Sequence, residues 1–279
     1  MALDSAISVF PFPHPTLAGE VADVCKAPAF LDAVQRAGTL QPDVHSWEEN
    51  AAAAHDLVLF ESLDSNFVCY PSPPRVIIAP RWLRLPRDMR AVDLLRTLAQ
   101  ASIHQGGRYA LCFTRMPSEA GYPGKLPSEF WYLWYAPMMW EAELMVFRWF
   151  PDSGVQRFRE KNLNQESEWR TAVWKQYWDD GRTLDSLKVF IAASARIWWY
   201  NALAERIPPA VARFSEDLRS AARALTELRS EVCAPILCQG SVAQALGALE
   251  AARDPTAYYP ALERLLTLLF PEVRVVPMA

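Results

Sequence analysis

The second half of the chain carries two long runs in which apolar residues recur every three or four positions, the spacing of one face of a helix. A tight corner at Arg206–Pro209 separates the two runs. This order predicts two antiparallel helices that pack on each other, and helices at 165–177, 242–252 and 258–270 complete a bundle. The runs consist of Leu184, Leu187, Ile191, Ser194, Trp198 and Asn201, followed by Val211, Phe214, Leu218, Ala221, Leu225, Leu228 and Val232.

The first half has a different character, because 15 of the 22 prolines lie at or before Pro151. Three short stretches rich in valine, isoleucine and aromatic residues predict strands at 57–60, 67–70 and 75–79. Helical spacing is expected at 17–37, 47–56, 88–104 and 128–150. The predicted fold class is therefore α+β and mainly α, with a small antiparallel sheet packed with helices and followed by a helical bundle.

The polar segment 151–164 contains turn residues and is the expected break between two subdomains, 1–150 and 151–279. Before it, the stretch 128–150 has one apolar stripe that is expected to be buried, and Pro137 is expected to kink this helix. The stripe consists of Trp131, Tyr135, Met138, Ala142, Met145 and Trp149.

Charge and glycine content exclude several classes of function. The 28 Lys and Arg residues against 32 Asp and Glu residues give a formal charge of −4, which argues against an extended nucleic-acid surface. Only 10 glycines are present, and the segment Gly121–Lys125 lacks the spacing of a phosphate-binding loop. No Gly-x-Gly-x-x-Gly or Gly-x-Ser-x-Gly motif occurs, so no cofactor is expected.

The five cysteines form no Cys-x-x-Cys pair, which is typical of buried thiols in a reducing compartment. Residues 1–12 contain no Lys or Arg, and no run reaches the roughly 20 apolar residues of a spanning helix. We expect a soluble cytoplasmic protein without membrane contacts. An effector exported without a classical signal would have the same features.

Residues 28–150 resemble a zincin-type metallopeptidase domain. The resemblance rests on the strand-like stretch 75–79, the helix LLRTLAQA at 94–101 and the segment Trp140–Arg148. In that family a strand edge binds substrate, the following helix carries His-Glu-x-x-His, and a downstream helix provides a carboxylate as the third zinc ligand. The resemblance implies the same fold here.

The motif itself is missing. Arg96 and Gln100 stand where the family has its two zinc histidines, and Thr97 stands where it has the general-base glutamate. Zinc hydrolysis needs three ligands and a base, so the resemblance implies a binding or regulatory protein without metal. The implied partner is a protein or peptide. Its cleft would be lined by Arg96, Gln100, His104, Glu141 and Glu143.

Two other functions fit the sequence. Cys69, His104 and Glu119 occur in the order of a cysteine hydrolase or acyltransferase, although Cys69 lies in an expected strand, which favours a buried structural thiol. The stretch 198–232 could instead act as a helical module that binds a protein or a second copy of this chain.

Tryptophans are unusually frequent between residues 131 and 199. They exceed what one buried stripe on each helix can hold, so some are expected to be exposed or to fill a subdomain junction. Three lie off the main stripes and form the expected aromatic surface: Trp134, Trp174 and Trp178.

Overall fold

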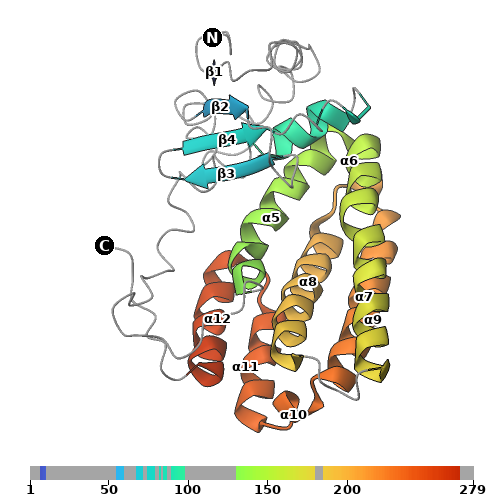
Figure 1. The fold of residues 1–279 in the computed structure, drawn as a ribbon, viewed down its shortest axis with the longest axis vertical. Coiled ribbons are helices and arrows are strands. Elements are labelled where there is room, and N and C mark those ends of the chain that lie inside the picture. Colours follow the sequence, from blue (N-terminus) through green and yellow to red (C-terminus); the bar gives the residue numbers. More distant parts are fainter. Residues whose placement is uncertain are drawn as a thin grey trace. The chain divides into compact units, whose positions relative to one another are not determined.

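The computed structural model is mainly helical (Figure 1). It describes residues 7–10, 55–59, 67–71, 74–78, 82, 84–86, 89–97, 130–179 and 185–270. Contacts divide the chain into two units. Unit 1 comprises Met1–Tyr109 and Glu141–Arg157, and unit 2 comprises Ala110–Trp140 and Phe158–Ala279. The sequence predicted two subdomains divided at 150/151, with the break in the segment 151–164. The unit boundaries fall at 109/110, at 140/141 and at 157/158, and the last of them lies within that segment.

Unit 1 contains a four-stranded sheet in the order β1-β2-β4-β3. The strands are β1 (Ile7–Phe10), β2 (His55–Leu59), β3 (Phe67–Pro71) and β4 (Pro74–Ile78). The pair β3/β4 is antiparallel, and the pairs β1/β2 and β2/β4 are parallel. Only two residues join β3 to β4, which requires a hairpin, whereas parallel neighbours need a longer connection. Hydrophobic alternation alone does not reveal this difference in direction.

The position of β4 bears on the metallopeptidase resemblance. β4 lies between β2 and β3, so the stretch 75–79 is not an edge strand of this sheet. Among the described strands, β1 and β3 stand at the two ends of the order. His55 begins β2 and does not end a helix, and the rest of the expected helix 47–56 lies outside the described residues, as does 17–37.

The segment 151–164 is helical and does not form a turn-rich linker, although the unit boundary 157/158 falls within it. α6 (Pro151–Phe158) is followed by the π-helix η5 (Arg159–Leu163) and by α7 (Asn164–Asp179). Pro151 occupies the first helical position, where its missing N–H costs nothing. Gly154, Arg157 and Phe158 are buried and share one face at helical spacing. A polar composition concealed this amphipathic pattern.

Proline 137 lies inside α5 (Phe130–Trp149), the expected helix before this segment. The predicted stripe is buried only in part: Ala142 and Met145 are buried, whereas Tyr135, Met138 and Trp149 are half-buried. A neighbouring set of residues is buried as well: Leu133, Ala136, Trp140, Leu144 and Phe147. α5 is apolar on several faces, so periodicity alone could not select the buried one.

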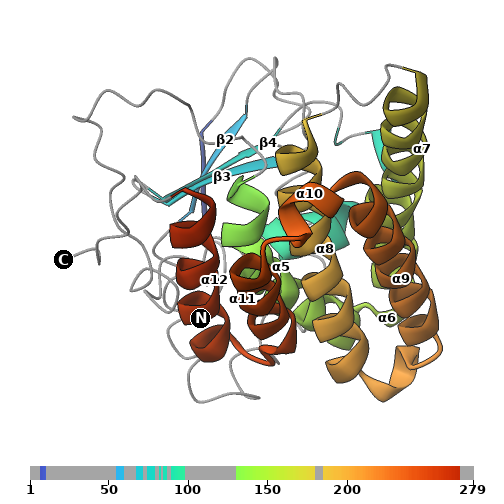
Figure 2. The same cartoon turned by 90° about the horizontal axis from the view of Figure 1, so that it is seen from below.

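The predicted helical hairpin is present in unit 2. α8 (Ser186–Arg206) and α9 (Phe214–Val232) are joined through the short 3-10 helix η6 (Pro209–Val211) and lie side by side (Figures 1 and 2). The Asp185 carboxylate caps α8 by accepting hydrogen bonds from the backbone N–H groups of Leu187 and Lys188, at 3.2 and 3.3 Å. The apolar face of 198–232 is thus largely buried within the unit.

Three more helices complete unit 2: α10 (Ala234–Leu237), α11 (Gly240–Ala251) and α12 (Pro255–Leu269). Trp198 of α8 packs on Tyr258 of α12 with ring centroids 4.3 Å apart and donates a hydrogen bond to the Ala252 carbonyl at 2.9 Å. The Tyr258 hydroxyl donates to the Leu133 carbonyl of α5 at 2.7 Å. Trp198 and Tyr258 are buried aromatic residues whose N–H and O–H groups are hydrogen-bonded, and they connect α5, α8 and α12.

None of the helices in the described part of the chain combines the length and hydropathy needed to cross a membrane.

Two glycine substitutions should have opposite effects on stability. A Cβ on Gly154 would lie 2.9 Å from a Val146 methyl carbon and 3.2 Å from Phe147, whereas a Cβ on Gly247 meets nothing within 4 Å. We expect Gly154→Ala to destabilise by about 1–3 kcal/mol through overpacking. Gly247→Ala should stabilise by about 0.5–1 kcal/mol through helix propensity. Urea unfolding measures both, and equal effects would contradict this packing of α6 on α5.

Candidate functional site

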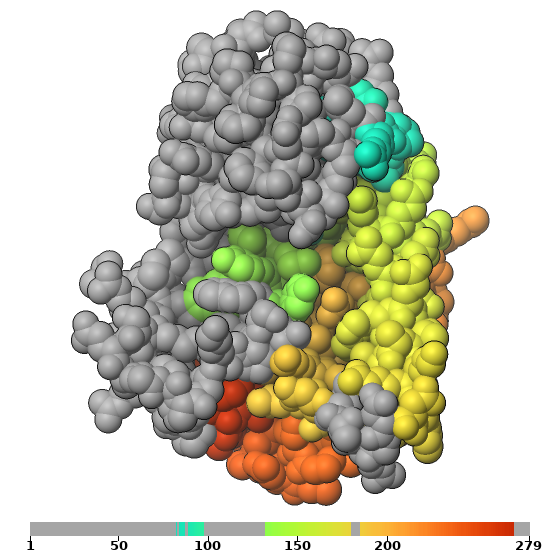
Figure 3. All heavy atoms as spheres, viewed as in Figure 1, coloured from blue at the N-terminus to red at the C-terminus, as the bar shows by residue number. Residues whose placement is uncertain are grey.

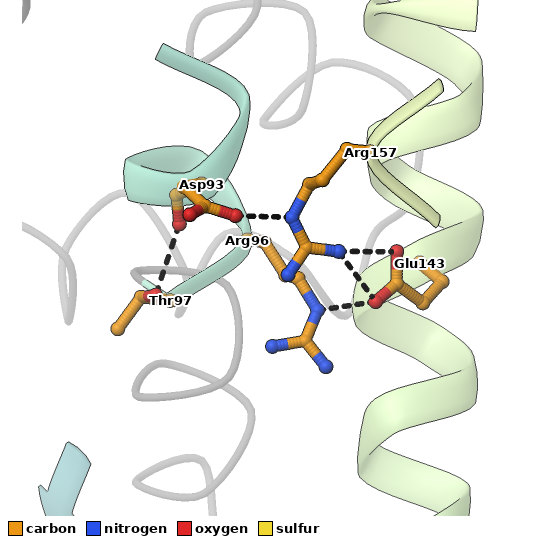
Figure 4. Close-up of polar contacts among 5 residues, drawn as sticks. All are labelled: Asp93, Arg96, Thr97, Glu143 and Arg157. Atoms are coloured by element: carbon orange, nitrogen blue, oxygen red, sulfur yellow. Dashed lines mark hydrogen bonds and ion pairs between the residues drawn. The ribbon is translucent and has the colours of Figure 1, made fainter. Parts of the chain in front are cut away.

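Four charged side chains form a buried cluster in unit 1 (Figure 4). Arg157 of α6 donates from Nε to Asp93 and from Nη1 to both carboxylate oxygens of Glu143, at 3.1 and 3.4 Å. Arg96 donates from Nε to Oε1 of the same Glu143. Asp93 and Arg96 lie on the helical residues 89–97, and Glu143 lies on α5. Three segments therefore meet at two carboxylates and two guanidinium groups.

Burial and the neighbouring charges determine the pKa values of the two arginines in this cluster. Burial alone lowers the pKa of Arg157, but Glu143 and Asp93 outweigh it, so the pKa is raised. For Arg96 burial prevails over the attraction of Glu143 and lowers the pKa from a very high ordinary value. Both guanidinium groups therefore stay protonated at neutral pH. The two positive and two negative charges cancel, which is the condition for keeping ions in a protein interior.

The cluster brings together only part of the predicted cleft. Arg96 and Glu143 are in contact, Glu141 is half-buried on α5, and Gln100 and His104 lie outside the described residues. Thr97 is buried and donates its hydroxyl to the Asp93 carbonyl at 2.9 Å. In the described ranges no three His, Cys, Asp or Glu side chains converge as metal ligands.

The sequence analysis missed Arg157 and Asp93. Arg157 lay in a segment interpreted as a polar break, and nothing in its neighbours marked it as buried. The usable signal was the spacing of Gly154, Arg157 and Phe158, which places an arginine on an apolar helix face. A buried arginine requires carboxylate partners, and Asp93 stands one helical turn from Arg96.

The candidate cysteine site falls mostly outside the described residues. Cys69 lies in β3, in agreement with the expected strand, while His104 and Glu119 are not described.

The predicted aromatic surface is only partly exposed. Trp178 is 68% exposed and stacks edge-on with Tyr177, with centroids 5.5 Å apart. Trp174 is half-buried against the other side of Tyr177 at 6.0 Å. Trp134 is half-buried and packs edge-on against Tyr259 at 6.4 Å. Trp178 is therefore the most accessible member of this set.

A second candidate site is a pocket of about 330 Å³ in unit 2. The surface is hollowed where α5, α7 and α8 meet (Figure 3). The π-helix η5 also contributes to the wall, and such helices occur frequently at functional sites. The lining comprises Tyr132, Ala136, Met139, Lys161, Asn162, Gln165, Glu166, Trp169, Ala195, Arg196, Trp199 and Tyr200.

Glu166 dominates the electrostatics of this pocket. Its side chain is 1% exposed, and burial raises the pKa of its carboxyl, while Tyr200, Arg196 and Arg170 oppose the rise. Burial and the nearby Glu166 charge raise the pKa of Tyr200 well above its ordinary value, so its hydroxyl stays protonated. Arg196 projects between two aromatic rings, with its guanidinium carbon 4.9 Å from the Tyr132 centroid and 5.2 Å from that of Trp169.

The sequence analysis did not single out Glu166 or Arg196. A glutamate or an arginine in a helix normally faces solvent, and the local sequence around these two residues does not mark them as buried. The one available signal was the excess of tryptophans around them, which pointed to the region but not to the polar residues.

Neither family models, nor curated proteins, nor solved structures yield a match to this chain.

A double-mutant cycle should show that Asp93 and Arg157 are strongly coupled in the free energy of unfolding. Asp93→Asn or Arg157→Gln alone leaves an uncompensated buried charge, so each should cost about 3–5 kcal/mol of unfolding free energy. The double variant should cost less than the sum of the two. As a matched control, the exposed pair Arg159–Asp217, 2.6 Å apart, should show a coupling of under about 1 kcal/mol in the same cycle. Additive losses at Asp93 and Arg157 would contradict the cluster.

The raised pKa of Glu166 predicts a dependence of stability on pH. Folding favours the protonated carboxyl, so stability is fully present below the ordinary value of 4.5 and is lost as the pH rises through the folded-state value. Glu166→Gln removes this titration and should gain stability relative to the natural chain as the pH rises from 4.5 to neutrality. Denaturation at several pH values measures the difference. Exposed Glu168→Gln on the same helix is the control, and parallel behaviour of the two variants would refute the assignment.

Proposed function

We propose that this protein is a non-catalytic binding or regulatory protein whose unit 1 is a metallopeptidase-like domain that has lost its zinc. The partner proposed for it is a protein or peptide, because the resemblance implies a domain that holds peptide chains. An extended peptide would add to an edge strand of the sheet, β1 or β3, through main-chain hydrogen bonds.

The contact between Arg96 and Glu143 is the observation that carries this proposal. The resemblance assigns Arg96 to the first zinc histidine and gives Glu143 as one of two candidates for the carboxylate ligand. Ligands of one zinc ion all lie roughly 2 Å from it, so their side chains converge on one point. A cationic side chain placed at that point would pair directly with the remaining carboxylate, and Arg96 pairs with Glu143.

Arg157 strengthens the argument. It engages both oxygens of Glu143 and also binds Asp93, so the carboxylate that a metal would need already has two cationic partners. A zinc ion would have to displace a guanidinium group and bring a further positive charge into a neutral cluster. The cluster therefore favours a structural role for Glu143 and disfavours metal hydrolysis in the natural chain.

Restoring the lost motif tests this proposal. Arg96→His, Thr97→Glu and Gln100→His together recreate His-Glu-x-x-His beside Glu143. We expect the triple variant to retain about one zinc ion per chain after dialysis, measured by elemental analysis, and the natural chain to retain none.

The matched control adds Glu143→Gln to the triple variant. Loss of a direct ligand should weaken zinc binding by more than the roughly 10- to 100-fold typical of an outer-shell change. Circular dichroism establishes that each variant is folded. A folded triple variant that binds no more zinc than its control, or a natural chain that purifies with stoichiometric zinc, would contradict the proposal.

A further inference from the structure

We propose that the pocket between α5, η5, α7 and α8 binds a small zwitterion, a free amino acid or a close analogue. Its ammonium group would lie at Glu166 and its carboxylate at Arg196 and Lys161. All the lining residues belong to unit 2, so this inference goes beyond the metallopeptidase-like origin of unit 1 and does not depend on it.

Unpaired polar atoms gather on this one pocket. Asn162 Nδ2 and Trp199 Nε1 are buried and have no hydrogen-bond partner among the described residues. Buried polar groups without partners are rare in native proteins, because each has given up its hydrogen bonds to water. Both residues line the pocket together with Glu166 and Tyr200, whose buried carboxyl and hydroxyl groups interact with each other. The two unpaired groups indicate a polar occupant that completes their hydrogen bonds.

Glu166 defines the group that its end of the pocket accepts. Its residue is 3% exposed, Arg170 Nε lies 3.6 Å from Oε1, and the Tyr200 hydroxyl and Arg196 also interact with the carboxyl group. An ionised carboxylate has about four lone-pair sites and only accepts hydrogen bonds, so a ligand at this end of the pocket must offer donors. An ammonium group supplies three donors and also balances the buried negative charge.

Arg196 and Lys161 are positively charged and therefore indicate that the ligand also carries an anionic group. The Arg196 guanidinium is held by cation–π contacts with Tyr132 and Trp169, and it donates one hydrogen bond to the Ala192 carbonyl at 3.3 Å. Its planar fork has further N–H groups that suit a carboxylate. Lys161 is half-buried on η5 and adds a second positive charge to the lining.

Charge and size together narrow the class of ligand. A pocket with a buried carboxylate and two cationic groups is complementary to a molecule that carries both charges. Its volume of about 330 Å³ is at the small end of ligand sites, which span roughly 300–1,000 Å³. The Arg196 guanidinium already lies against the Tyr132 and Trp169 rings, so a nucleobase would have to displace it in order to stack on them. A free amino acid satisfies all three conditions.

The direct test adds each standard L-amino acid in turn to the full-length protein. Tryptophan fluorescence reports binding, because Trp169 and Trp199 line the pocket, and a rise in melting temperature confirms it independently. We expect at least one amino acid to bind saturably. Its N-acetyl derivative, without the ammonium group, and its amide, without the carboxylate, should each bind at least about tenfold more weakly because each loses a charge-assisted pair.

Pocket variants locate the site. Glu166→Gln and Arg196→Gln should each weaken binding at least about tenfold. Glu168→Gln on the exposed side of α7 and Arg213→Gln at an exposed position before α9 are matched controls and should leave binding unchanged. The neutral glutamine at 166 removes a buried charge, so this variant is expected to fold.

Several outcomes would overturn the proposal. They are the absence of binding by any free amino acid, equal binding of the free and N-acetylated forms, and binding that is unaffected by both pocket variants. Preferential binding of a nucleoside monophosphate would also overturn it. A high-resolution structure of crystals grown with saturating amino acid would overturn the proposal as well if only water contacted Glu166 Oε2 and Asn162 Nδ2.

Discussion

Arg157 donates hydrogen bonds to two carboxylates, and unit 1 depends on this interaction. This one side chain binds Asp93, 64 residues away, and Glu143, 14 residues away, and thereby joins the helical residues 89–97, α5 and α6. Gly154 lets α6 approach α5 closely enough for Arg157 to reach Glu143. Because a buried carboxylate without a cationic partner is strongly unfavourable, the ion pairs and the packing of the three segments depend on each other.

Unit 2 is organised differently. Its central helix, α8, is buried along almost its whole length, and aromatic contacts from Trp198, Tyr258 and Phe158 fill the space around it. The pocket at Glu166 and Tyr200 departs from this apolar packing, because Asn162 and Trp199 bury polar atoms there that have no partner among the described residues. Such groups give the pocket a physical reason to bind a polar ligand.

Part of this picture could be predicted from the sequence. The hairpin of α8 and α9, together with α11 and α12, followed from apolar spacing at three and four residues, since amphipathic helices carry that signal locally. The pairing of Arg96 with Glu143 was anticipated only as a question raised by the resemblance. The parallel pairings of β1 with β2 and of β2 with β4, and the partners of Arg157, were not predictable, because they depend on contacts between residues far apart in sequence. The depth of Glu166 is also a tertiary property, which its local sequence does not encode.

The central claim is that the Arg96, Glu143, Arg157 and Asp93 side chains form a closed ion cluster, in which both guanidinium groups bind the Glu143 carboxylate. Nitrogen-edited NMR of the arginine Nε–H groups in the natural chain tests it most directly. A buried, hydrogen-bonded guanidinium exchanges its Nε proton slowly, so Arg157 should give a sharp and protected resonance that does not change when zinc is added. Rapid exchange of the Arg157 Nε proton with water, or a shift of this resonance at stoichiometric zinc, would contradict the account.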